Sequence, residues 1–144
     1  MSGSAPTAPA PIRLARLARA LGVLAALATV WCVATDEPAR LLGLRLPGPV
    51  VVQALYAGTA LAGPVPMVLA CFLLGRAVRA GSDRAVRGFG VLCAAALVGM
   101  LGEEITYRVL TPGGFQLVPS AFVVLNLVVP AIALGVVLRA SRWA

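Results

Sequence analysis

The chain alternates between four long apolar segments and short connections that hold most of its charged and turn-forming residues. A helix that crosses a membrane needs about 20 predominantly apolar residues, and each of the four segments can supply this length. The pattern therefore predicts an all-α integral membrane protein, built as a bundle of four transmembrane helices. The expected spans are residues 14–34, 50–74, 88–110 and 119–138.

The short connections leave room for one membrane domain, residues 13–144, and for no separate soluble domain. Residues 1–12 are rich in proline, serine and alanine, which predicts a disordered N-terminal tail. The connection 35–48 combines leucines with arginines, and it fits either a short helix on the membrane surface or an ordinary loop.

The first segment has two interpretations. Three arginines precede an uncharged run that ends in small residues, and this order is also typical of a cleaved secretory signal peptide. We favour a retained helix, because Trp31 suits the interfacial belt of a membrane span and the rest of the chain is equally apolar.

The arginine distribution predicts the orientation. Nine of the twelve basic residues lie at the N-terminal end up to Arg19, between the second and third spans, or after the fourth span. Because basic residues accumulate on the cytoplasmic side, both termini should be cytoplasmic in a multi-pass protein of the cell membrane. The net charge of +7 then reflects topology and lipid contact, and we expect no nucleic-acid partner.

The composition narrows the possible chemistry. Hydrophobic residues make up 60% of the chain, and the mean hydropathy is +0.97. There is no histidine, the commonest metal ligand and general base, and no lysine to form a Schiff base. Cys32, Cys71 and Cys93 lie in different segments and are interpreted as small buried hydrophobic residues. We therefore expect no cofactor and no metal site.

The third segment holds the two most informative acids, Glu103 and Glu104. Residues 88–102 alone would form only about 22 Å of helix, against a hydrocarbon core of about 30 Å. The helix is therefore predicted to continue through both acids to Leu110, before residues 111–114 (TPGG) end it. Both carboxyl groups would then lie close to the outer end of the span.

Helical periodicity separates these two acids. Glu103 shares a face with small residues, which predicts that it points into the bundle. Glu104 lies on another face and is expected to pair with Arg108, four residues later. In one interpretation both carboxylates are solvated at a helix end, paired with Arg108, Arg40 or Arg45. In the other, Glu103 is a protonatable acid in a polar pocket with neighbouring polar residues, which are Tyr107, Gln53 and Asn126.

Three classes of function follow. The first is an accessory or ligand-binding protein that associates with the bilayer, a lipophilic small molecule, further copies of itself or a larger membrane complex. The second is an enzyme that isomerises or cyclises an isoprenoid or polyketide, with Glu103 as the general acid and Glu104 or Tyr107 assisting. The third is a small proton-coupled transporter. The candidate ligand-binding residues are Gln53, Tyr56, Asn126 and Arg108.

Overall fold

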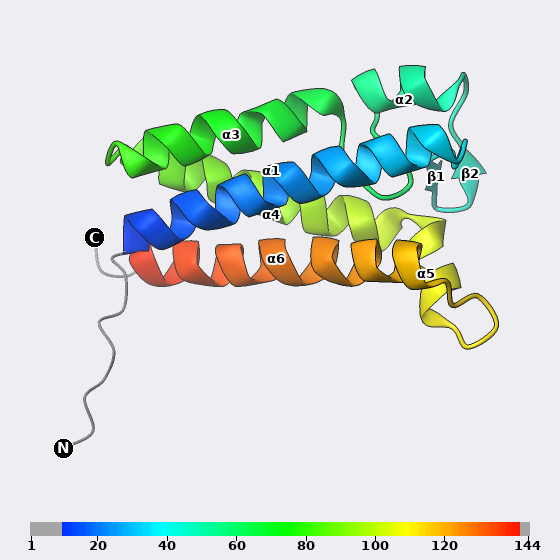
Figure 1. The fold of residues 1–144 in the computed structure, drawn as a ribbon. Coiled ribbons are helices and arrows are strands. Elements are labelled where there is room, and N and C mark those ends of the chain that lie inside the picture. Colours follow the sequence, from blue (N-terminus) through cyan, green and yellow to red (C-terminus); the bar gives the residue numbers. More distant parts are fainter. Residues whose placement is uncertain (1–9, 142–144) are drawn as a thin grey trace.

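The computed structural model describes residues 10–141, so residues 1–9 of the predicted tail lie outside the described range. The described part is mostly helical, with one short hairpin (Figure 1). The elements are α1 (Ala10–Ala34), β1 (Arg40–Leu41), β2 (Leu44–Arg45), α2 (Val50–Tyr56), α3 (Val65–Arg79), α4 (Asp83–Gly102), α5 (Glu104–Leu110) and α6 (Leu117–Ser141).

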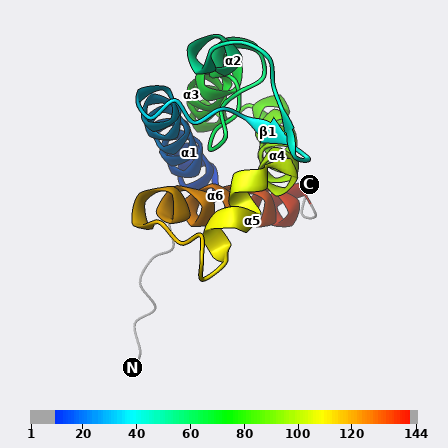
Figure 2. The same ribbon diagram turned by 90° about the vertical axis from the view of Figure 1, so that its right-hand side faces the viewer.

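The four longer helices, α1, α3, α4 and α6, form a bundle. Figure 2 views this bundle along its length, with α1 beside α3 and α6, and with α4 completing the arrangement. The start of α1, the end of α3, the start of α4 and the end of α6 lie at one end of the bundle (Figure 1). The hairpin, α2 and α5 cover the opposite end.

Small side chains allow α1 and α3 to approach closely. A Cβ atom added at Gly75 of α3 would lie 3.1 Å from the Cβ atom of Ala18 in α1. A Cβ atom at Gly22 of α1 would lie 2.9 Å from the Phe72 ring in α3. Close backbone approach through glycine and alanine is the usual way in which helices pack when lipid surrounds them.

The three cysteines are free thiols, one in each of α1, α3 and α4, and all three side chains are buried. Cys32 belongs to the half of the core near α2 and α5. Cys71 and Cys93 belong to the other half, together with Phe89. The prediction that these residues serve as small buried hydrophobic side chains is confirmed.

Three helices, α1, α4 and α6, are long and apolar enough to cross a membrane. Large apolar side chains also point outward along the bundle, including Leu27, Leu73, Val91, Val98 and Ile132. Apolar surface on this scale indicates contact with a lipid bilayer. Two helices are longer than the spans predicted for them. Helix α1 starts at Ala10, inside the predicted tail, and α6 covers Leu117–Ser141, whereas the predicted span was 119–138.

The prediction of one continuous helix over residues 50–74 is wrong. Helix α2 ends at Tyr56, and a non-helical segment, residues 57–64, precedes α3. Gly58 has a φ of +100°, which a helix cannot accommodate. Pro64 then caps α3 and Pro66 lies in its first turn, where the missing N–H costs no helical hydrogen bond. The chain therefore breaks the helix at this point and starts a new one.

The prediction of one helix over residues 88–110 is also wrong. Helix α4 starts earlier, at Asp83, with the Ser82 hydroxyl accepting a hydrogen bond from the backbone N–H of Ala85. It ends at Gly102, because Glu103 adopts an extended backbone with φ −82° and ψ 132°. Helix α5 begins at the next residue. Glu103 therefore connects two helices and does not extend one.

A hydrogen bond from a distant segment accompanies this break. The backbone N–H of Leu42 donates to the carbonyl oxygen of Gly102 over 2.8 Å, which satisfies a group left open at the end of α4. Leu42 and Gly43 both have positive φ, as a type I′ hairpin turn requires. The connection after α1 is therefore a hairpin, and no short surface helix forms there.

Candidate ligand-binding cavity

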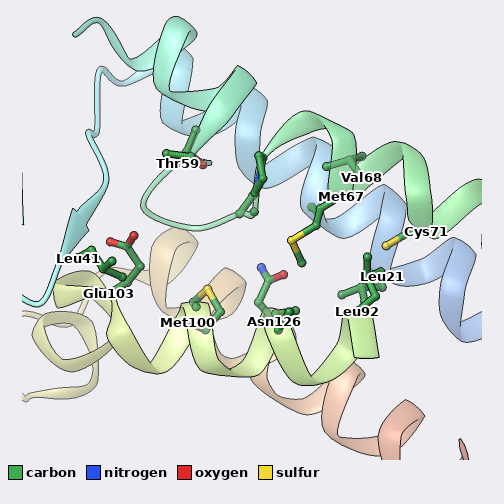
Figure 3. Close-up of a pocket in the computed structure, with 18 residues that line it drawn as sticks. Leu21, Leu41, Thr59, Met67, Val68, Cys71, Leu92, Met100, Glu103 and Asn126 are labelled. Atoms are coloured by element: carbon green, nitrogen blue, oxygen red, sulfur yellow. The ribbon is translucent and has the colours of Figure 1, made fainter. Parts of the chain in front are cut away.

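A cavity of about 240 Å³ lies inside the bundle, between α1, α3, α4 and α6. Most of its wall is apolar and comes from α1, α3 and α4, as Figure 3 shows for Leu21, Met67, Leu92 and Met100. Three polar side chains line it: Thr59, Glu103 and Asn126. The arrangement suits a mainly apolar molecule with a polar group at one end.

Both interruptions of the helices border this cavity. Ala57, Thr59 and Ala62 of the 57–64 segment line it from one side, and Glu103 lines it from another. Non-helical backbone is tolerated at membrane depth only where protein buries it or where it lines a cavity. The two breaks therefore supply the polar end of a site whose remaining wall is helical and apolar.

Glu103 is buried, with 8% of its surface exposed. Its Oε2 atom accepts a hydrogen bond from the backbone N–H of Arg40 over 2.9 Å. In Figure 3 its carboxyl group is directed away from α4, toward the loop that carries Thr59. Glu103 lies just beyond the apolar helix α4. Burial raises the pKa of this carboxyl group, the Arg40 hydrogen bond partly opposes the rise, and the charge of Glu104 adds to it.

Thr59 and Asn126 are the other polar groups of the cavity. The buried Thr59 hydroxyl has no nitrogen or oxygen partner among residues 10–141, and it lies beside the weakly polar thiol of Cys32. Asn126 donates from Nδ2 to the carbonyl oxygen of Phe122 over 3.0 Å, which leaves its Oδ1 atom out of this bond. Asn126 can therefore offer its Oδ1 atom to a molecule in the cavity.

The cavity opens sideways, along α4. Ala95 and Gly99 line it, and yet both residues are exposed at the surface of the bundle. A Cβ atom added at Gly99 would meet no atom within 4 Å. Gly63 and Met67, on the α3 side, also line the cavity. A molecule could therefore reach the cavity between α3 and α4 from the surrounding lipid.

The hairpin closes the end of the cavity that lies near α2 and α5. Leu41 lines it and lies against α4, since a Cβ atom at Gly102 would be 2.9 Å from Leu41 Cδ1. Two ion pairs hold the surrounding elements: Arg40 with Glu104 at 3.5 Å, and Arg108 with Glu37 at 2.8 Å. The predicted pair between Glu104 and Arg108 is therefore wrong. Both residues lie in α5, but each side chain pairs with a residue outside that helix, Glu104 with Arg40 and Arg108 with Glu37.

The remaining predicted site residues lie outside the cavity lining. Gln53 is fully buried and hydrogen bonds to the backbone of the hairpin connection. Tyr56 is exposed and donates to the carbonyl oxygen of Pro47. Tyr107 is exposed and donates to the carbonyl oxygen of Leu101. The exposed Arg108 forms its ion pair at the surface. Of the predicted site residues, only Glu103 and Asn126 line the cavity.

Sequence reasoning missed Thr59. It lies within a long uncharged run, where a single hydroxyl carries little signal. Its neighbours held a clue: a glycine at position 58 and prolines at positions 64 and 66 bracket the segment that breaks the helix. Glycine and proline at this spacing could have indicated a loop, with Thr59 inside it.

No protein-family model, curated protein or solved structure matches this chain. Within residues 10–141, no three cysteine or acidic side chains gather in a way that could hold a metal ion. The three candidate spans and the outward apolar side chains indicate a small multi-pass membrane protein. The cavity is therefore the feature of this molecule that indicates a function.

Proposed function

We propose that this protein binds a small lipophilic molecule with one hydrogen-bonding group in the cavity between its helices. The observation that supports this most strongly is the pairing of an apolar wall with polar groups from two helix breaks, Thr59 and Glu103. A core built only for stability would fill this space with apolar side chains and would give a buried hydroxyl a nitrogen or oxygen partner.

The cavity volume limits the size of the molecule. An apolar protein cavity of about 150 Å³ holds a benzene molecule, so by scaling this one holds roughly ten non-hydrogen atoms. A bicyclic phenol or a short isoprenoid alcohol has this size. Its polar group would lie near Glu103 and Thr59, and its hydrocarbon part between Met67 and Leu92.

We also infer that α2 and α3 together make a fourth pass across the cytoplasmic membrane, with both termini on the cytoplasmic side. Helix α3 has 15 residues, about 22 Å, which is too short to cross alone. The 57–64 segment and α2 add the missing depth, and buried Ala60 and Leu61 keep the segment away from lipid. Most arginines lie at the opposite end of the bundle from the hairpin, which supports this orientation.

Thermal unfolding in detergent tests the binding proposal, with 1-naphthol as the probe. At about ten times its dissociation constant, a bound probe should stabilise the protein by about 1.4 kcal/mol. Gly99→Leu should abolish this stabilisation, because the new side chain occupies the opening of the cavity. Gly135→Leu is the matched control, since Gly135 is an exposed glycine of α6 with equally open surroundings and does not line the cavity.

The comparison of these variants separates binding from partition into the micelle. Stabilisation of the native protein and of Gly135→Leu, with none in Gly99→Leu, supports the cavity as the binding site. An equal response in all three proteins would refute the proposal, because a probe that acts through the detergent does not distinguish the two glycines.

A second function, acid catalysis on a bound lipophilic substrate, is favoured by the buried carboxyl group of Glu103 and the rise in its pKa. Geraniol, an isoprenoid alcohol of suitable size, is a direct test. Glu103 would protonate its hydroxyl group, water would leave, and its return at the other end of the allyl cation would give linalool and restore the proton. Glu103→Gln should remove product formation, whereas the surface variant Glu104→Gln should retain it. No linalool from the native protein would exclude this reaction.

A further inference from the structure

A second, basic groove lies at the end of the bundle opposite the hairpin. It has a volume of about 640 Å³ and lies between the first turns of α1 and the last turns of α3. Figure 1 shows these two helix ends at the same end of the bundle. Four arginines line the groove, two from each helix: Arg16 and Arg19, and Arg76 and Arg79.

The close packing of the two helices brings these arginines around a common space. Gly75 lies at the base of the groove, where a Cβ atom would be 3.1 Å from the Cβ atom of Ala18 and 3.5 Å from the carbonyl oxygen of Ala15. On each helix the two arginines are three residues apart, so they project from neighbouring turns on one side. The groove is therefore walled by guanidinium groups from both helices.

Within the described residues, no acid pairs with these four arginines, and both ion pairs that do form lie at the hairpin end. Four of the five acids of the chain also lie at that end. The fifth, Asp83, begins α4 at the same end as the groove, but it forms no ion pair with the four arginines. Guanidinium groups bind phosphate oxygens with two parallel hydrogen bonds, so four of them favour a phosphate group.

Apolar surface continues from the groove along both helices. On α1, Val23 and Leu27 follow Arg19 at four-residue steps, and both are exposed. On α3, Leu73 and Leu69 precede Arg76 by one and two turns, and both are exposed. A molecule that fits the groove and this surface together has an anionic head and hydrocarbon chains.

We propose that this groove binds the headgroup of an anionic phospholipid, whose acyl chains lie along the seam between α1 and α3. A free phosphate ion would use the arginines and leave the apolar seam empty, so a lipid matches the surface better. Basic recesses between helices at the cytoplasmic face are suited to such lipids. This site is separate from the cavity and does not depend on the function proposed for it.

Native mass spectrometry of the full chain in neutral detergent tests the proposal. Phosphatidylglycerol should bind as a discrete adduct, whereas phosphatidylcholine and inorganic phosphate should not compete with it. The double variant Arg19→Gln/Arg76→Gln should bind phosphatidylglycerol roughly thirtyfold more weakly. Arg84→Gln/Arg87→Gln removes the same charge outside the groove and should bind as the native protein does.

The charge-retaining variant Arg19→Lys/Arg76→Lys shows whether a loss comes from misfolding. It should bind more weakly than the native protein, because lysine cannot form the two parallel hydrogen bonds, but more tightly than the glutamine double variant, because the charge is kept. Equal weakening in both glutamine double variants would overturn the proposal, since attraction would then come from overall charge. Equal binding of phosphatidylcholine, or displacement of phosphatidylglycerol by inorganic phosphate, would overturn it as well.

Discussion

Gln53 makes the most demanding test of the structure, because one buried side chain holds a whole connection. Its Oε1 atom accepts a hydrogen bond from the backbone N–H of Ala39 over 3.0 Å. Its Nε2 atom donates to the carbonyl oxygens of Leu46 and Gly48, each over 2.8 Å. The amide thereby joins both ends of the hairpin connection to α2. Gln53→Leu keeps the approximate shape and removes all three bonds.

The three bonds set the size of the effect. Each hydrogen bond contributes about 0.5–1.5 kcal/mol net, so losing three should lower the local stability of the connection by about 2–4 kcal/mol. In Gln53→Leu the buried backbone N–H of Ala39 has no hydrogen-bond partner. The loss of stability should therefore lie in the upper part of this range. Tyr56→Phe is the control, since it removes one exposed hydrogen bond, to Pro47, and should change the stability by less than about 1 kcal/mol.

Hydrogen–deuterium exchange of the full chain in detergent measures this local effect. Amides of residues 39–46 should exchange roughly thirty to several hundred times faster in Gln53→Leu, while those of α6 should stay unchanged. Tyr56→Phe should resemble the native protein. Native-like protection of this connection in Gln53→Leu would refute the assignment of Gln53 as its anchor. Gln53 would then be free for the ligand-binding role that the sequence indicated.

Two further predictions concern the buried acid and the orientation. The raised pKa of Glu103 means that the folded protein binds the proton more tightly than the unfolded chain, so the free energy of unfolding should fall as the pH rises from about 4.5 through the raised value. Glu103→Gln should lack this component in thermal unfolding measured against pH, and identical profiles for both proteins would contradict it. Reporter fusions after Ala144 and within residues 79–84 should be cytoplasmic, and fusions near Arg45 and Gly114 external; an external C-terminus would reverse the proposed orientation.

For Glu103 the predicted burial is correct, but the helical structure from which it was predicted is wrong. The small-residue face predicted that its side chain points inward, and the residue is indeed buried. The prediction assumed a continuous helix, however, whereas Glu103 ends α4 in an extended conformation. Its burial comes from the hairpin, which covers it and supplies the N–H of Arg40.

The sequence alone determined the class of protein. Long apolar runs are buried either in lipid or in a protein core, and runs that reach the length of a membrane span favour lipid. Local signals also identified chain reversals, such as residues 111–114 (TPGG) between α5 and α6. These features depend on residues close together in the sequence, which is why they could be predicted.

The tertiary structure alone decided where the helices break and what those breaks form. A proline or an acid in an apolar run is compatible with a bend, a break or a continuous helix, because the outcome depends on what satisfies the freed backbone groups. Here those partners are distant in the sequence: Glu103 binds the N–H of Arg40, and Leu42 binds the carbonyl of Gly102. No local pattern encodes such pairings, so the cavity that they border appears only once the chain has folded.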